Sequence, residues 1–150
     1  MPELQIRPAV EADLPAVVAL LADDVLGAGR ETPDDLVPYR AAFARLSTDP
    51  NQLLMVAVRA DTVVGTLPLS IVPGLSRRGR TRSIIEAVRV HRDERGSGLG
   101  TTLVRWAVSE SRRRGCGLVQ LTSDRTRTDA HRFYERLGFT ASHVGFKLEL

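Results

Sequence analysis

Residues 95–100 read Arg-Gly-Ser-Gly-Leu-Gly ("RGSGLG"), a turn that stands between a β-branched run and an amphipathic run. Three closely spaced glycines cost conformational entropy on folding, so the chain must need unusual backbone angles or a close backbone approach here. A turn from strand to helix directs several backbone N–H groups toward one point, and the helix dipole adds partial positive charge there. The stretch therefore predicts either a plain tight turn or a binding site for phosphate.

Two common phosphate-binding patterns fit this turn poorly. The nucleotide P-loop requires a lysine before Ser or Thr, whereas Gly100 is followed directly by Thr101. The dinucleotide fingerprint requires G-x-G-x-x-G, and the three glycines here are spaced G-x-G-x-G instead. A diphosphate still fits the predicted geometry, because glycine does not block its approach and Arg92 or Arg95 can supply opposite charge.

Hydrophobic periodicity predicts alternating strands and helices on both sides of the turn. A strand–helix–strand unit across 84–123 requires a parallel strand pair with a right-handed crossover, while the strands of 52–92 form an antiparallel meander. The predicted elements are a strand at 4–9, helices over 14–25 and 32–46, two strands within 52–72, a strand at 81–92, a helix over 99–114, a strand at 116–124, a helix over 128–138 and a final strand or hairpin over 139–150.

The predicted fold class is α/β, with a central mixed, mostly antiparallel sheet and helices on both faces, in a single domain over residues 1–150. Three local features are specific enough to test. Val25 is expected on the apolar face of the first helix, Thr32 is expected to cap the second, and Pro38 is expected to kink it. A tight turn is expected at Ala60–Asp61.

Composition is that of a globular protein, with 43% hydrophobic and 26% charged residues among 150. No apolar stretch near the start is long enough to span a bilayer, and the first residues show no secretion signal. A single cysteine, Cys116, excludes an intramolecular disulfide and fits a cytoplasmic location. His91, His131 and His143 form no metal-ligand spacing with it, so no metal site is expected.

Charge is distributed unevenly along the chain. The residues through Asp61 carry 5 basic and 10 acidic side chains, and the remainder carries 16 basic and 8 acidic ones. The excess of arginine can reflect genome composition alone, but it lies in the half that contains the glycine turn. A basic surface there would attract an anionic ligand, either a phosphorylated cofactor or a nucleic acid.

The order of motifs resembles a known family over nearly the whole chain. The turn matches R/Q-x-x-G-x-G/A, the coenzyme A pyrophosphate loop of the GNAT superfamily of N-acetyltransferases. Thirty residues on, the segment at 130–139 reads "AHRFYERLGF", similar to that family's A-x-x-F-Y-x-x-x-G-F helix, and the segment at 6–21 reads "IRPAVEADLPAVVALL", similar to its usual opening. The loop and this helix, at this separation, form a specific signal.

The resemblance implies a fold, a cosubstrate and a set of contacts. It implies a GNAT-type fold that binds acetyl-CoA and transfers the acetyl group to an amine. It further implies that the strand at Val88 and Val90 pairs through its backbone with the pantetheine arm. Arg127 replaces an asparagine common in the family, and its role there is open. The implied coenzyme contacts in the loop are Arg95, Gly96, Ser97, Gly98, Leu99, Gly100 and Thr101.

Two side chains are candidates for proton transfer. Glu86 is predicted to share a face with Ile84, Val88 and Val90, and a carboxylate among apolar neighbours suits a general base. A bulge on this strand, as in the resembling family, would change that alternation. The alternative is a buried Glu86 that is paired with an arginine such as Arg82 or Arg125. Tyr134 is the candidate general acid, because the resembling motif points this hydroxyl at the thioester sulfur; the alternative is a core tyrosine.

The acceptor and the partners are less constrained. Glu31, Asp34 and Asp35 favour a cationic amine, whereas the loop at 73–80, with "LSRRGR", favours an acceptor carrying carboxylate or phosphate. The leading hypothesis is N-acetylation of a small-molecule or peptide amine, without nucleic-acid or membrane partners and with a homodimer possible as in similar proteins. The alternatives are a non-catalytic acetyl-CoA sensor and, third, a nucleic-acid-binding module.

Overall fold

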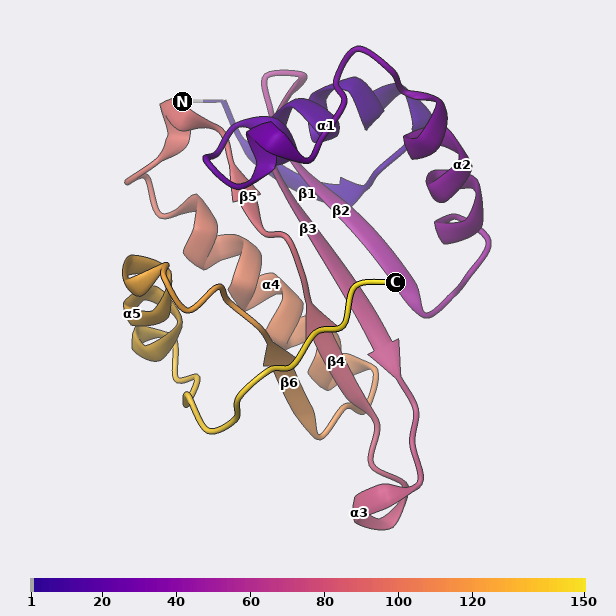
Figure 1. Cartoon of the computed structure of the whole chain (residues 1–150), viewed down its shortest axis with the longest axis vertical. Coiled ribbons are helices and arrows are strands. Elements are labelled where there is room, and N and C mark those ends of the chain that lie inside the picture. The colour runs from indigo at the N-terminus through magenta and orange to yellow at the C-terminus, as the bar shows by residue number, and fades with distance from the viewer. Residues whose placement is uncertain (1) are drawn as a thin grey trace. The chain divides into compact units, whose positions relative to one another are not determined.

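The computed structural model describes residues 2–150 and divides the chain into two units. The first unit runs to Gln120 and the second is Leu121–Leu150, and each is described by itself. Most of the sheet belongs to the first unit (Figure 1), as do the buried hydrophobic residues. The candidate site is therefore described mainly within the first unit.

Up to α5 the elements follow the predicted order, with three additional short 3₁₀ turns and one short helix, Ser76–Gly79, in the segment predicted as a loop. The second unit contains one helix, α5 (Thr128–Arg136), and the last strand residue, Leu121. The other elements are β1 (Leu4–Pro8), η1 (Glu11–Asp13), α1 (Leu14–Ala22), η2 (Gly27–Gly29), α2 (Val37–Leu46), β2 (Gln52–Arg59), β3 (Thr62–Val72), α3 (Ser76–Gly79), β4 (Arg82–Ile85), β5 (Arg89–Val90), η3 (Arg92–Glu94), α4 (Leu99–Arg113) and β6 (Leu118–Leu121).

The strands form one six-stranded sheet. Its order is β1-β2-β3-β4-β6, and β5 pairs with β3 outside this path. The pairs that β3 makes with β2, β4 and β5 are all antiparallel, as is β1 with β2. Ala60 and Asp61 connect β2 to β3 with φ of +50° and +62°, the left-handed pair of a type I′ hairpin turn. The predicted antiparallel meander and its tight turn are confirmed.

Helices cover both faces of this sheet in the first unit. A side chain at Gly65 of β3 would come within 3.1 Å of Leu103 and 3.4 Å of Leu99, so α4 lies on that face. The next residue, Thr66, points to the opposite face and lines a cavity together with side chains of α1 and α2. The prediction of helices on both faces is confirmed.

Two helix boundaries differ from the prediction. α1 ends at Ala22, and Val25 is 95% exposed beyond it, so the predicted apolar face was extended too far. α2 begins at Val37 rather than near Thr32, which instead accepts a turn hydrogen bond from the Asp35 amide at 3.0 Å. Pro38 consequently lies in the first turn, where a missing N–H costs least, and it kinks nothing.

The last predicted strand is absent. Residues 139–150 adopt neither helix nor strand, although Val144, Phe146 and Leu148 alternate with more polar residues. Their exposed fractions are 79%, 93% and 86%. An alternating pattern identifies the face that a strand would bury, but it does not supply the neighbour that completes the hydrogen-bond ladder.

Candidate functional site

The candidate site begins where the meander is interrupted between β4 and β5. β4 pairs with β3 up to Ile85, opposite Leu69, and β5 resumes pairing at Arg89, opposite Thr66. Three residues on one strand therefore face two on the other, which is the one-residue excess of a β-bulge. Ala87 lies in the bulge with φ of +44°, a backbone conformation that favours glycine.

The bulge reverses which side chains face which helices. The Glu86 amide donates to the Pro68 carbonyl at 3.1 Å, and Pro68 lines the cavity beneath α1 and α2. Beyond the bulge Val90 lies opposite Gly65, on the face that α4 covers. Glu86 therefore does not share a face with Val88 and Val90, and the predicted alternation is wrong because one inserted residue inverts it.

Glu86 is exposed, so the alternative of a buried, arginine-paired Glu86 does not hold within the first unit. Within the first unit, none of the ion pairs of the described residues includes Glu86 or its proposed partner Arg82. Pairing with Arg125 falls in the second unit and stays a prediction. An exposed carboxylate beside a strand break can accept a proton from a ligand or from water without first losing a protein partner.

The β5 edge presents backbone donors. The His91 amide donates to the Val64 carbonyl at 2.8 Å. This bond shows which backbone amides in this segment point toward β3. Because neighbours alternate in an antiparallel ladder, the amides of Val88 and Val90 point away from β3. Within residues 2–150, β5 pairs with no other strand. An extended ligand can add to this edge through hydrogen bonds to the main chain.

The glycine turn is open on its outer side. Gly96 and Gly98 have φ of +81° and +87°, which explains why glycine is required at both positions. A side chain built at either one would meet no atom within 4 Å. The turn is therefore not packed against the first unit's own atoms, and a ligand can approach its backbone closely.

The turn leads into the N-terminus of α4, a helix of 15 residues. In the part of the chain that the structure describes, no acceptor meets the amides of Leu99, Gly100 and Thr101, and no side chain caps the helix. Three such N–H groups, together with the dipole of α4, make a site for an anion. The residues present fit a diphosphate, as the predicted coenzyme loop requires.

Hydrogen bonds within the first unit hold the turn in place. Glu94 accepts from Arg59 Nε at 2.9 Å and from the Ser97 hydroxyl at 3.2 Å. Both members of the Arg59–Glu94 pair are mostly buried, with 18% and 14% of their side chains exposed. The turn is thus anchored to β2, and Ser97 contributes to its shape through Glu94.

The arginines of the turn are already paired. Asp23, at the end of α1, lies 2.6 Å from Arg92 and 3.7 Å from Arg95. The adjacent Asp24 lies 3.2 Å from Arg89 of β5. These two aspartates neutralise positive charge next to the turn and connect α1 to the loop. The attraction for an anion therefore comes mostly from the backbone amides.

The second unit contains the two remaining predicted site residues. Tyr134 packs edge-to-face against Phe133 and Phe139, with ring centroids 5.1 and 5.8 Å apart, and its carbonyl accepts the Phe139 amide at 3.1 Å. Arg127 is exposed at the N-terminal boundary of α5. Their predicted roles toward the coenzyme are not tested by this geometry.

Other titratable groups have local explanations. The Thr126 hydroxyl and amide hydrogen-bond to Asp124 and lower the pKa of its carboxyl group. Burial raises the pKa of the Cys116 thiol. Among residues 2–150 no three His, Cys, Asp or Glu side chains gather as metal ligands. None of the helices described there has the length and apolar character needed to cross a membrane.

Sequence reasoning missed several residues that shape this site. Ala87 gave no signal, because alanine is common in strands and its left-handed backbone depends on the pairing of β3 with two partners. Asp23 and Asp24 lie about 70 residues before their arginine partners, and a single sequence does not show such a contact. The cavity lined by α1, α2 and the sheet was also missed, since its apolar residues are indistinguishable from core residues in sequence.

Comparisons with known proteins now decide the family. The model of the Acetyltransferase (GNAT) family matches residues 14–139. The chain belongs to this family. This acetyltransferase is 34% identical to the aminoalkylphosphonate N-acetyltransferase of Salmonella typhimurium over 146 residues, which are 97% of this chain and 91% of the relative. The GNAT fold and the enzyme class inferred from the resemblance are confirmed.

Solved structures agree on the fold. A crystal structure described as a transcriptional regulator from Bacillus halodurans C-125 matches the acetyltransferase with a TM-score of 0.95 and 45% identity, covering 99% of this chain and all of the other. A Trypanosoma brucei acetyltransferase matches with a TM-score of 0.78 and 30% identity, covering 99% of this chain and 100% of the other. GNAT acetyltransferases use acetyl-CoA as cosubstrate.

Proposed function

We propose that this acetyltransferase transfers the acetyl group of acetyl-CoA to the primary amine of a small molecule. The observation that carries the proposal is the open glycine turn with free amides at the start of α4. The turn adjoins a strand edge with unpaired donors and a strand break beside an exposed carboxylate. These three features form one continuous stretch, residues 86–101.

Each part of this stretch has a proposed task toward acetyl-CoA. Residues 95–101 hold the diphosphate, with Gly96 and Gly98 leaving room and the amides of Leu99, Gly100 and Thr101 donating to its oxygens. The Val90 amide pairs with the pantetheine arm. The Val88 amide donates to the thioester carbonyl oxygen, where negative charge develops as the amine attacks. When bound, the coenzyme supplies the activated acetyl group.

Proton transfer is proposed for two side chains. Glu86 takes a proton from the acceptor ammonium or amine, directly or through water, because only the neutral amine attacks. The amine nitrogen bonds to the acetyl carbon and the carbon–sulfur bond breaks, so the thiolate leaves with the electron pair. Tyr134 gives the thiolate its proton. Arg127 is proposed to contact the coenzyme's phosphates.

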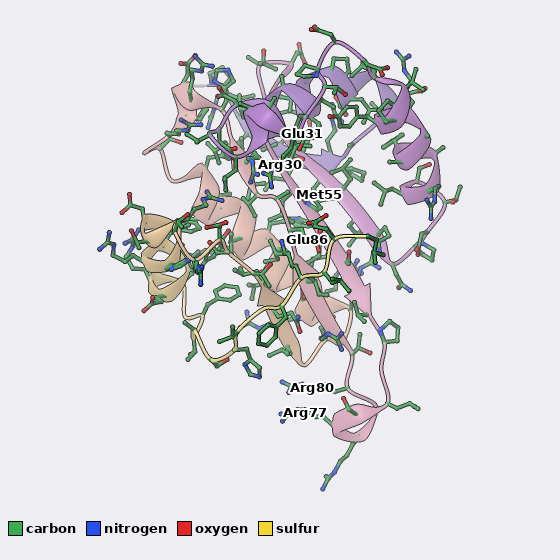
Figure 2. All side chains as sticks on the ribbon, viewed as in Figure 1. Arg30, Glu31, Met55, Arg77, Arg80 and Glu86 are labelled. Atoms are coloured by element: carbon green, nitrogen blue, oxygen red, sulfur yellow. The ribbon has the colours of Figure 1, made fainter. Side chains whose placement is uncertain are left out.

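The two charged segments, which favour opposite acceptors in the sequence, lie apart from or are engaged away from the proposed base. Figure 2 shows Arg77 and Arg80 at the end of the β3–β4 hairpin that lies far from Glu86. Arg80 donates to the Gly117 carbonyl. Glu31 accepts from the Tyr39 hydroxyl at 2.9 Å. The basic loop is therefore no longer an argument for an anionic acceptor, although one relative is named for aminoalkylphosphonates.

The remaining expectations stay proposals. We expect residues 1–150 to act as a single domain in the cytoplasm, with a homodimer as a further possibility. Nucleic acid and membranes are not expected as partners. Peptide amines remain an alternative acceptor class, and sedimentation of the purified chain with and without acetyl-CoA tests the homodimer.

The direct test of the proposed function monitors free thiol while the full chain is mixed with acetyl-CoA and a panel of small primary amines. Mass spectrometry of the products identifies N-acetylated amines. The proposal predicts amine-dependent thiol release with matching product. Binding of acetyl-CoA without thiol release from any amine would contradict the proposal and favour the alternative of a non-catalytic sensor. The similar structure from Bacillus halodurans is described as a transcriptional regulator.

A further inference from the structure

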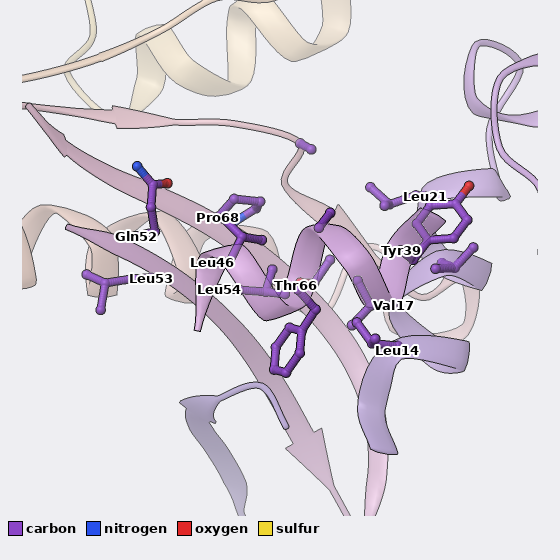
Figure 3. A pocket seen from close by; sticks show the side chains of 14 residues that line it. Leu14, Val17, Leu21, Tyr39, Leu46, Gln52, Leu53, Leu54, Thr66 and Pro68 are labelled. Atoms are coloured by element: carbon purple, nitrogen blue, oxygen red, sulfur yellow. The ribbon is translucent and has the colours of Figure 1, made fainter. Parts of the chain in front are cut away.

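An apolar cavity lies next to the proposed site, within the first unit. It has a volume of about 180 Å³ and lies between α1, α2, β2 and β3. Figure 3 shows Tyr39 and Leu21 at one end and Gln52 and Leu53 at the other. Its lining is almost entirely hydrocarbon, and none of the lining residues carries a charge.

Two of the residues that line the cavity are exposed to solvent. Ala87 of the bulge and Ala42 of α2 both line it, and both are exposed. Glu86 precedes Ala87 and hydrogen-bonds to Pro68, another lining residue. The end of the cavity at Ala87 is therefore adjacent along the chain to the proposed base and the Val88 amide, where the amine must attack.

The helix α2 covers the cavity and is more exposed than α1. No residue of α2 is fully buried, whereas Leu14, Val17 and Val18 of α1 on the same cavity are at most 4% exposed. Tyr39 is fixed at its hydroxyl, which accepts the Thr32 amide at 2.8 Å and donates to Glu31. These two hydrogen bonds hold the Tyr39 ring at one end of the cavity.

We propose that this cavity holds the non-reacting part of the acceptor, and that this part is a branched alkyl or phenyl group of about five to seven carbons. The inference rests on the proposed function and specifies its acceptor. An apolar cavity of about 150 Å³ can hold a benzene ring, so the volume here suits a group of that size. A phosphonate or carboxylate in the cavity would be buried without a cation, which is strongly unfavourable.

The position of the cavity then fixes the orientation of the bound acceptor. Its hydrocarbon end lies under α2 against Leu14, Val17 and Phe43, and its amine emerges at Ala87 toward Glu86. Any anionic substituent of the amine must remain outside this cavity, at the solvent-facing end. The acceptor is then chosen by apolar shape and not by charge.

The experiment compares kcat/KM for matched amines by free-thiol release from acetyl-CoA. The panel is 3-methylbutylamine and 2-phenylethylamine against ethylamine, ethanolamine and 2-aminoethylphosphonate. Because of the added hydrocarbon contacts, kcat/KM should be about tenfold or more higher for the first two amines than for the other three. Equal or better use of 2-aminoethylphosphonate would overturn the inference while leaving acetyl transfer itself intact.

Two variants locate the effect. Ala42→Trp places an indole in the cavity and should raise KM for 3-methylbutylamine by about tenfold or more. Ala44→Trp alters an exposed alanine of the same helix that does not line the cavity, and should leave KM unchanged. The same KM in both variants, at matched thermal midpoints, would overturn the assignment. Thiol release from no amine at all would overturn the proposed function as well.

Discussion

At the scale of single residues, Ala87 explains most of the difference between the predicted and the observed site. One residue with left-handed backbone angles inserts into a strand and turns Val88 and Val90 to the face opposite Glu86. The same exposed residue lines the cavity and lies within the break in pairing. A strained, non-glycine conformation of this kind is a common feature of functional sites.

Glu86 gives the sharpest residue-level prediction. Glu86→Gln keeps the size of the side chain but removes its ability to take a proton, so kcat/KM should fall by about 10²- to 10⁴-fold. Acetyl-CoA affinity and the thermal midpoint should not change, because the side chain is exposed. Steady-state thiol release measures the effect, and Glu149→Gln, another exposed glutamate, is the control. Full activity of Glu86→Gln would remove it from the mechanism.

The role of Tyr134 is tested by removing only its hydroxyl group. Tyr134→Phe retains the ring that packs on Phe133 and Phe139. If the hydroxyl protonates the leaving thiolate, kcat should fall by about tenfold or more while the Kd of acetyl-CoA changes little. Single-turnover kinetics separate the two quantities. A change in Kd with unaltered kcat would assign Tyr134 to binding.

At the scale of elements, α4 connects core packing to the proposed diphosphate site. Its N-terminal Leu99 and the next-turn Leu103 are buried against Gly65, which fixes where the free amides of the helix point. Further along, the hydroxyls of Ser111 and Ser83 of β4 lie 2.7 Å apart in the core. The helix is therefore held along its length while only its first turn is left open to a ligand.

An ion-pair cluster in the last turn of α4 predicts that the stability of the fold depends on pH. Arg113, together with Arg114, holds the pKa of Glu110 at about 2. Since the folded pKa lies below the ordinary value of 4.5, this stabilisation is full above pH 4.5 and is lost as the pH falls toward 2. Arg113 is largely exposed, so solvent screening limits the contribution to about 1 kcal/mol.

Urea unfolding of Glu110→Gln measures that contribution. The variant should be less stable than the wild type at pH 7 by about 1 kcal/mol, and the difference should shrink as the pH approaches 2. Asp129→Asn is the matched control, because its ion pair with Arg132 has the same spacing on a helix but Asp129 is 97% exposed. A difference that persists unchanged at low pH would contradict the electrostatic origin.

At the scale of the whole molecule, sequence periodicity predicted the element order and the helices on both faces. These follow from local patterns such as the α4 stripe and the Ala60–Asp61 turn. The family resemblance allowed for a bulge on the strand of Glu86, but periodicity did not give its place at Ala87. The Asp23–Arg92 pair and the cavity under α2 could not be predicted, because each depends on residues that meet only after the sheet has formed. The glycine turn was recognised because its chemistry is contained in six consecutive residues.

The glycine turn also offers the most direct measurement, isothermal titration of acetyl-CoA into two matched variants. Gly98→Glu and Gly115→Glu each place a glutamate on a glycine with left-handed φ, +87° and +80°, with no atom within 4 Å, at opposite ends of α4. Their backbone strain is therefore similar, but only the first sets a negative charge against the proposed diphosphate site. We predict that Gly98→Glu weakens binding by about 100-fold or more and that Gly115→Glu leaves it unchanged. Equal affinity in the two variants would contradict the assignment of the turn as the coenzyme site.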